Sequence, residues 1–256
     1  AANTVSTAED TDYVFTVADF GFTDTADTAD VMASVKITTL EAVGDLKLNG
    51  ADVTLNQVIT VADIIADKLT FTPVADASSS AYDSFEFAVI DDNASSAATG
   101  VNEDATPRVM TIDVTAVNDA PINTVPDATV TVNEDTALIF NASNSNLISV
   151  ADVDATNLTV KLTVSQGTLT LASITNLTID AGADGSATVT FTGAKADVNT
   201  ALNGLSYTGT NNYNGSDSLE IVVTDDAGTA LTDTDTVAIT VAPVNDAPVG
   251  TANTVS

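Results

Sequence analysis

The sequence has no cysteine, no histidine and no tryptophan. Without cysteine it can form neither disulfides nor thiolate metal sites, and without histidine it has no Ser-His-Asp triad, no Cys-His pair and no histidine-ligated zinc. The motifs GxxxxGK(S/T), GxGxxG and GxSxG are also absent. Acids are numerous enough for a glycosidase pair, but they fall in repeated positions, and the lack of tryptophan removes the usual stacking platform for sugars. We therefore expect no catalytic residues and no enzyme activity.

Positive charge is also scarce. Six Lys and Arg face 36 Asp and Glu, which gives a formal net charge of -30. Nucleic acids and anionic membrane surfaces are bound through clusters of Lys and Arg, so neither is an expected partner. No stretch approaches the roughly 18 consecutive apolar residues of a membrane span, so we expect no membrane insertion. Charge of one sign opposes compaction unless counter-ions gather at it, and divalent cations are the obvious candidates.

Several segments of the chain recur. AVNDAP at Ala116–Pro121 returns as PVNDAP at Pro243–Pro248, EDT at Glu9–Thr11 returns at Glu134–Thr136, and DSFEFAVIDD at Asp83–Asp92 matches DSLEIVVTDD at Asp217–Asp226. The string ANTVS at Ala2–Ser6 also recurs at Ala252–Ser256. These repeats predict two tandem domains of about 125 residues each, 1–121 and 122–248, with 249–256 as the start of another repeat of the first kind.

Apolar residues alternate with polar ones in short runs, as in Phe85, Phe87 and Val89. Runs of period two that are rich in Val, Ile and Thr and separated by Asp, Asn or Gly are typical of half-buried strands. We expect an all-β protein of two antiparallel Greek-key sandwiches with about seven strands each. The segments Val61–Asp67 and Ala194–Leu202 break the pattern. Each predicts one short helical crossover, begun by Asp63 or Asp197.

The acids gather where the predicted strands end. In the first half they are Glu9, Asp24, Asp27, Asp30, Asp91, Asp92, Asn118 and Asp119, and in the second half Glu134, Asp152, Asp154, Asp225, Asp226, Asn245 and Asp246. Calcium takes about six to eight oxygen ligands, and several loops together can supply them. Asp and Asn also make turns, and we prefer that reading for isolated acids such as Asp180 and Asp184. Clusters that recur in both halves favour calcium, although none has the spacing of an EF-hand.

A Glu on the first strand, a DxD after the second, a TD before the last hairpin and VNDAP at the exit together resemble cadherin repeats. The resemblance is strongest to the cadherin-like tandem repeats of giant bacterial surface adhesins, which are type I-secreted and RTX-adhesin-like, and it covers essentially both halves. It implies calcium at domain junctions. For the central junction it implies Glu9, Asn118, Asp119, Asp152, Asp154 and Asp225 or Asp226; for a following junction Glu134, Asn245 and Asp246; and for a preceding one Asp27, Asp24 or Asp30, and Asp91 or Asp92. The cadherin linker reads DxNDNAP, whereas here Ala116 and Pro243 replace its first Asp and one Asn is missing, which implies fewer ions per junction or a rearranged site.

Three functions fit the sequence. The first is a calcium-stiffened spacer of an extracellular adhesin at a bacterial cell surface, with neighbouring repeats as its partners and a role in cell adhesion and biofilm. The second is a module that binds a surface glycan or protein, for which Phe20, Phe22, Tyr82 and Tyr213 are the aromatic residues to test against simple core packing. The third is homophilic adhesion between arrays.

Overall fold

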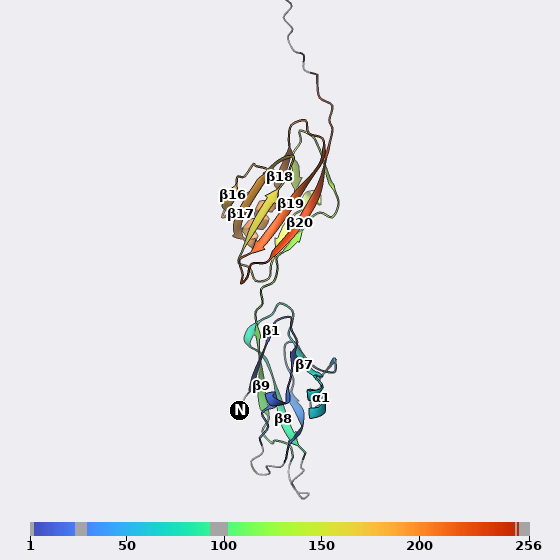
Figure 1. The fold of residues 1–256 in the computed structure, drawn as a ribbon, viewed down its shortest axis with the longest axis vertical. Coiled ribbons are helices and arrows are strands. Elements are labelled where there is room, and N and C mark those ends of the chain that lie inside the picture. The colour runs from blue at the N-terminus through green and yellow to red at the C-terminus, as the bar shows by residue number, and fades with distance from the viewer. Residues whose placement is uncertain (1–2, 24–29, 93–101, 249, 251–256) are drawn as a thin grey trace, which may run out of the picture. The chain divides into compact units, whose positions relative to one another are not determined.

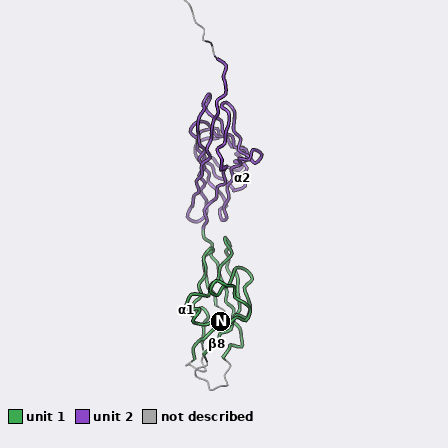
Figure 2. The backbone as a smooth tube through the Cα atoms, turned by 90° about the vertical axis from the view of Figure 1, so that its right-hand side faces the viewer, with its two compact units in different colours: residues 1–117 green, residues 118–256 purple. Residues whose placement is uncertain are grey.

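The computed structural model describes residues 3–23, 30–92, 102–248 and 250. The chain divides into two compact units, Ala1–Val117 and Asn118–Ser256, which Figure 2 shows in two colours. This division falls just before the boundary expected at residue 121. Asn118 and Asp119 belong with the second unit. The Asn118 side-chain amide donates a hydrogen bond to Asp225, and the Asp119 backbone N–H donates one to Asp154.

Unit 1 has two facing sheets (Figure 1). The five-stranded sheet has the order β1 (Asn3–Ala8), β9 (Arg108–Thr115), β8 (Ser79–Asp91), β3 (Met32–Thr39) and β6 (Val58–Thr60). The four-stranded sheet has the order β2 (Tyr13–Val14), β7 (Leu69–Thr72), β4 (Asp45–Leu48) and β5 (Ala51–Asp52). β1 runs parallel to β9, and every other strand pair in the described part of the unit is antiparallel.

Unit 2 repeats this plan with a wider sheet. Its six-stranded sheet has the order β11 (Val130–Asn133), β20 (Thr232–Ala242), β19 (Gly215–Asp225), β14 (Asn157–Thr163), β17 (Thr188–Ala194) and β16 (Thr178–Gly182). The others are β12 (Leu138–Phe140), β18 (Leu205–Gly209) and β15 (Gly167–Thr170) in one sheet, and β10 (Ile122–Thr124) with β13 (Ser149–Ala151) in another. As in unit 1, the first strand of the large sheet is parallel to the last, β11 to β20.

The cores differ in composition. In unit 1 the rings of Phe15, Phe20, Phe85 and Phe87 contact one another, and each side chain is at most 2% exposed. The core of unit 2 is mainly Val, Leu and Ile around Phe140, Phe191 and Tyr207, for example the inward residues of β14 and β19. Burial alternates along these strands, as the period-two pattern predicts. The all-β, sandwich-type fold expected from the sequence is confirmed.

Both predicted crossovers are helical, as α1 (Val61–Ile65) and α2 (Lys195–Leu202). They begin earlier than predicted: the Thr60 hydroxyl accepts a hydrogen bond from the Asp63 N–H at 3.1 Å and caps α1, whereas Ala194 precedes α2 without a side-chain cap. Two short 3-10 helices, η1 (Val17–Phe20) and η2 (Ala142–Asn144), were not expected. The described residues form nine strands in unit 1 and eleven in unit 2, more than seven each, because several are two or three residues long. No helix in the described part of the chain is long and apolar enough to cross a membrane.

Candidate metal-binding residues

Glu9 follows the first strand of unit 1 and contacts the segment by which the chain leaves this unit. It directly follows β1, and its side chain is buried, with 3% exposed. Its backbone N–H donates to the Thr115 carbonyl at 3.0 Å, and its Oε1 accepts the Val117 N–H at 2.6 Å. The carboxylate thus holds the last residue of unit 1 in place beside β1.

Glu134 makes the same contacts in unit 2. It is 5% exposed, its N–H donates to the Ala242 carbonyl at 2.9 Å, and its Oε1 accepts the Val244 N–H at 2.6 Å. Val117 and Val244 each precede an Asn-Asp-Ala-Pro segment. A buried carboxylate therefore fixes the start of the linker sequence in both units.

The predicted DxD loop of unit 2 is folded around Asp152. One oxygen of Asp152, Oδ1, accepts the N–H groups of Asp154 at 2.9 Å and Ala155 at 2.6 Å. Asp154 in turn accepts the backbone N–H of Asp119 at 2.9 Å through its Oδ2. The second oxygen of Asp152, Oδ2, is buried and has no hydrogen-bond partner among the described residues.

Asp225, at the end of β19, holds the other linker residue. It is 5% exposed, and its Oδ2 accepts hydrogen bonds from the Asn118 amide at 3.1 Å and the Leu231 N–H at 3.0 Å. The Asn118 amide also donates to the Thr229 carbonyl at 3.1 Å. This leaves Asn118 Oδ1 buried and, within the described chain, without a hydrogen bond. Unit 2 therefore brings together five predicted residues: Asn118, Asp119, Asp152, Asp154 and Asp225.

Asp226 has a different role from its neighbour. Its Oδ1 accepts the N–H groups of Thr156 at 2.9 Å and Asn157 at 3.1 Å, and its Oδ2 accepts the Asn157 amide at 2.9 Å. The hydrogen bonds from Asn157 and then Thr156 lower the pKa of Asp226 below its ordinary value. The oxygens of Asp226 hold the start of β14, whereas Asp225 contacts the linker residue Asn118, so Asp225 is the better ligand candidate of the two.

The other predicted residues are more scattered. Asp30 is 7% exposed, Asp91 ends β8, and Asp92 accepts the Val31 N–H at 3.2 Å through Oδ1. Asp24 and Asp27 lie outside the described residues. Asn245 and Asp246 are exposed beyond β20.

The donor set in unit 2 suits a hard divalent cation. Carboxylate and amide oxygens converge on the linker from three segments, and two of these oxygens, Asn118 Oδ1 and Asp152 Oδ2, are buried without a proton donor among the residues described. A buried polar atom without a partner is costly, and an oxygen-seeking ion such as calcium would relieve that cost. The residues present therefore fit calcium.

Two further groups of acids hold loops in place, a role that we did not expect from the sequence. Asp83 and Asp217 each accept backbone N–H groups of a neighbouring loop. Asp10 and Asp135, both with positive φ, accept the N–H groups of Asp76 and Asn212. Their recurrence in DS and EDT was visible in the sequence, but only the structure shows that they hold loops.

The four candidate surface aromatics pack inward. Phe20 is 2% exposed, and Phe22, Tyr82 and Tyr213 are half-buried against the cores of their units. They therefore form no exposed aromatic cluster for a ligand.

Comparison with known proteins gives similarities at low identity. A family model described as "Protein GAMETE EXPRESSED 2 domain" matches residues 136–234, which is less than half of the chain. No curated protein matches. The similar solved structures include human mucin-like protocadherin EC1-2 (13% identity, 95% of this chain and 97% of that chain, TM-score 0.37) and human CDH23 EC21-23 (12%, 94% and 72%, TM-score 0.43). Another is Drosophila N-cadherin EC1-4, at 12% identity over 93% of this chain and 48% of that chain, with a TM-score of 0.41.

All three structures are of cadherins or protocadherins, and with TM-scores below 0.5 they carry no argument about this chain. The sandwich itself, with its first strand parallel to its last in both units, is read directly from the strand pairing. What the chain binds must be argued from its own residues.

Proposed function

We propose that this chain is a pair of calcium-binding structural repeats from a tandem extracellular array, in which calcium at each domain junction stiffens a rod that supports cell adhesion. Buried glutamates with the same contacts in both units carry the proposal. Glu9 and Glu134 are each at most 5% exposed and each hold the residue before an Asn-Asp pair. An isolated carboxylate is rarely buried without a partner charge, and an ion at the adjacent linker would supply it.

Covalent connection brings the ligands of both units to one linker. Val117, Asn118 and Asp119 are consecutive, and they are held by Glu9, Asp225 and Asp154, respectively. Consecutive Cα atoms are about 3.8 Å apart, so three acids from two units are anchored to a stretch of two peptide bonds. We infer that the central site uses Glu9, Asn118, Asp119, Asp152, Asp154 and Asp225.

The mechanism is cross-linking by charge. Carboxylates held this close repel one another, and a calcium ion turns the repulsion into a bridge between loops of adjacent repeats. The bridge restricts rotation about the linker. We expect dissociation constants of about 10⁻⁴ to 10⁻³ M, the range of extracellular modules.

The cellular setting follows from this role. The partners are neighbouring repeats of the same polypeptide, and the VNDAP repeats favour an array at a bacterial cell surface, with attachment or biofilm formation as its outcome. Glu134, Asn245 and Asp246 would serve a following junction, and Asp30, Asp91 and Asp92 a preceding one. Homophilic adhesion between arrays is a second candidate function, which experiments on the same chain can test.

The test compares Glu9→Gln with Glu134→Gln in the 256-residue chain, by calorimetric titration with calcium. Gln keeps an oxygen that can accept the Val117 or Val244 N–H and loses only the charge. Glu9→Gln should weaken calcium binding by about tenfold, because one anionic ligand is lost from a junction that both units build. Glu134→Gln is the matched control and should leave that site unchanged.

Equal effects of the two variants, or no binding by the unmutated chain, would overturn the proposal. Small-angle scattering with calcium and with a chelator then tests stiffening. Calcium should narrow the range of interdomain arrangements, and Glu9→Gln should reduce that effect. Self-association that depends on calcium, seen by ultracentrifugation, would favour homophilic adhesion.

A further inference from the structure

Unit 1 contains a small polar pocket at the end of β1 and β9 that lies away from Glu9 and Val117. It is a cavity of about 130 Å³. β1 and β9 run parallel from Asn3 and Arg108 toward Val117, so the pocket at their first residues and the linker at their last lie at opposite ends of the unit. The pocket is thus separate from the proposed central calcium site.

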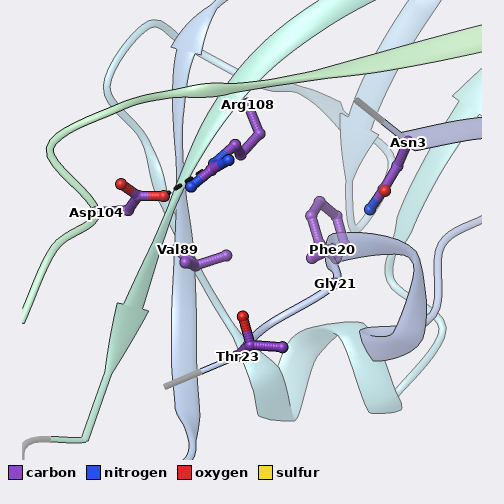
Figure 3. A pocket seen from close by; sticks show the side chains of 7 residues that line it. All are labelled: Asn3, Phe20, Gly21, Thr23, Val89, Asp104 and Arg108. Carbon is purple, nitrogen blue, oxygen red and sulfur yellow. Dashed lines mark hydrogen bonds and ion pairs between the residues drawn. The ribbon is translucent and has the colours of Figure 1, made fainter. Parts of the chain in front are cut away.

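The pocket holds the chain's one arginine (Figure 3). Arg108 Nε donates to Asp104 Oδ2 at 3.0 Å, and Asp104 Oδ1 accepts the Thr106 N–H at 2.9 Å. The Thr106 N–H and, to a lesser degree, the guanidinium lower the pKa of Asp104, so this carboxylate is an acceptor at neutral pH. The terminal nitrogens of Arg108 make no hydrogen bond to the described residues and remain as donors.

The opposite wall is built by Asn3 and Gly21. The Asn3 amide donates to the Asp19 carbonyl, which leaves Asn3 Oδ1 as an acceptor. Gly21 has φ +56°, and a Cβ there would lie 3.0 Å from Asn3 Nδ2. Glycine therefore allows both the turn after η1 and the close approach of the Asn3 side chain.

The remaining walls combine one more hydroxyl with an apolar floor. Thr23 lies across the hollow from Arg108, and Phe20 and Val89 form apolar surface between the polar groups (Figure 3). Phe20 is 2% exposed, so it contributes a ring edge or face to the cavity without becoming a free stacking surface.

The chemistry of these walls narrows the class of ligand. An anion would meet Asp104 and a chain of net charge -30, and a cation would meet the guanidinium. An apolar ligand would leave the donors and acceptors without partners. A neutral ligand whose neighbouring groups both donate and accept avoids all three costs, and the vicinal hydroxyls of a sugar do so: one can donate to Asp104 while the next accepts from Arg108.

We propose that this pocket binds one neutral saccharide ring, such as the terminal residue of a surface glycan. The volume limits it to one ring that is partly inserted, because about 130 Å³ lies well below the roughly 300–1,000 Å³ of pockets for larger ligands. Binding is weak for a single ring, and an array that repeats unit 1 would gain strength from multivalency. The pocket would add direct glycan contact to a repeat that otherwise acts as a spacer, and it does not depend on calcium at the central junction.

The experiment titrates the isotopically labelled 256-residue chain with methyl glycosides of glucose, galactose and mannose, and follows backbone amide signals. At least one glycoside should shift the amides of Gly21, Thr23, Asp104 and Arg108, with a dissociation constant in the millimolar range. Acetate and acetamide serve as carboxylate and amide probes of the same pocket, for an acidic or a peptide ligand. The titrations are run with calcium and with a chelator.

Variants connect the shifts to the pocket. Arg108→Met removes the guanidinium and should weaken glycoside binding by about tenfold. Lys47→Met is the control, since Lys47 also pairs with an acid in unit 1, but from β4 in the other sheet. Thr23→Val changes an exposed hydroxyl at little risk to folding and should weaken binding less than Arg108→Met does.

Three results would overturn the proposal. One is the absence of shifts at these amides with every glycoside. Another is a larger response to acetate or acetamide than to any glycoside, which would assign the pocket to an acidic or a peptide ligand. The third is equal glycoside binding by Arg108→Met, Thr23→Val and Lys47→Met.

Discussion

At the scale of single residues, Asp217 shows how an acid can serve the fold alone. It is 9% exposed and accepts hydrogen bonds from the N–H groups of Ser165, Gln166 and Ser218 and from the Tyr207 hydroxyl, at 2.8–3.1 Å. Burial and then Asp217 raise the pKa of Tyr207, because the neutral hydroxyl is the form that donates to the carboxylate. Asp217→Ala removes the acceptor of three part-buried N–H groups and leaves the buried Tyr207 hydroxyl with the Gln166 carbonyl alone, so we expect it to lower the free energy of unfolding of unit 2 by about 3 kcal/mol.

The matched control is Asp83→Ala in unit 1. Asp83 accepts the Ala42, Val43 and Ser84 N–H groups, but it is only half-buried. The position that corresponds to Tyr207 is Phe71 in unit 1, which has no hydroxyl to donate. Water can replace the lost acceptor there, so we expect a loss of about 1 kcal/mol. Urea unfolding of both variants measures the difference. Equal losses in the free energy of unfolding would contradict the larger structural role given to Asp217.

Tyr13 makes the stability of unit 1 decrease at high pH. Its hydroxyl donates to Asp19 Oδ2 at 3.1 Å, and burial, followed by the Asp19 charge, raises its pKa to about 12. The unfolded chain loses this proton near its ordinary pKa of about 10, whereas the folded chain keeps it, so the stability contribution is complete below pH 10 and is lost as the pH rises toward 12.

Tyr13→Phe should therefore flatten the loss of unit 1 stability between pH 10 and 12. The chain's two methionines, Met32 and Met110, both lie in the unit 1 core, so their methyl NMR signals report the unfolding of that unit alone. An unchanged pH profile in Tyr13→Phe would show that Tyr13 does not carry this dependence.

The sequence predicted the members of the candidate site better than their roles. Asn118, Asp119, Asp152, Asp154 and Asp225 are brought together in unit 2, as expected from their positions at strand ends. The sequence does not distinguish Asp225 from Asp226, because Asp225 ends β19 and Asp226 directly follows it, and only the structure shows that Asp226 accepts backbone N–H groups at the start of β14. Recurrence by itself does not identify a metal ligand, since Asp10, Asp83 and their counterparts recur as well and accept N–H groups of neighbouring loops.

At the scale of elements, the short helix α1 depends on its cap. It spans only five residues, and isolated helices of this length are unstable, so the Thr60 hydroxyl that accepts the Asp63 N–H has a large share in fixing its start. Thr60→Ala should lower the free energy of unfolding of unit 1 by about 1 kcal/mol. Thr60→Ser keeps the hydroxyl and should stay within about 0.3 kcal/mol of the unmutated chain, whereas similar losses in both variants would mean that the cap is not the cause.

Element prediction succeeded where periodicity was long. The strands β9, β14, β19 and β20 carry seven or more residues with alternating burial, and each was visible as an alternating run. Strands such as β2 and β5, of two residues, exist only through pairing with β7 and β4. No local pattern encodes such pairing, because strand preference depends on the neighbour across the sheet.

At the scale of the whole molecule, the net charge of -30 makes two kinds of cation effect separable. General screening depends on ionic strength: the Debye length falls from about 30 Å at 0.01 M to about 8 Å at 0.15 M. With a chelator present, added sodium chloride should therefore raise the melting temperature gradually by reducing self-repulsion. This effect belongs to all 36 acids and reveals nothing about any particular site.

A calcium site should add a second, saturable effect on top of screening. At fixed ionic strength, calcium at about ten times its dissociation constant stabilises the folded state by about 1.4 kcal/mol, whereas magnesium, which demands stricter geometry and keeps its waters, should give much less. Asp152→Asn removes the charge from the buried oxygen that lacks a proton donor in the described structure, and it should abolish most of the calcium increment while leaving the sodium chloride response intact. Thermal unfolding in matched sodium, magnesium and calcium series decides the question, because equal increments from calcium and magnesium in both chains would reduce the candidate site to diffuse counter-ion binding.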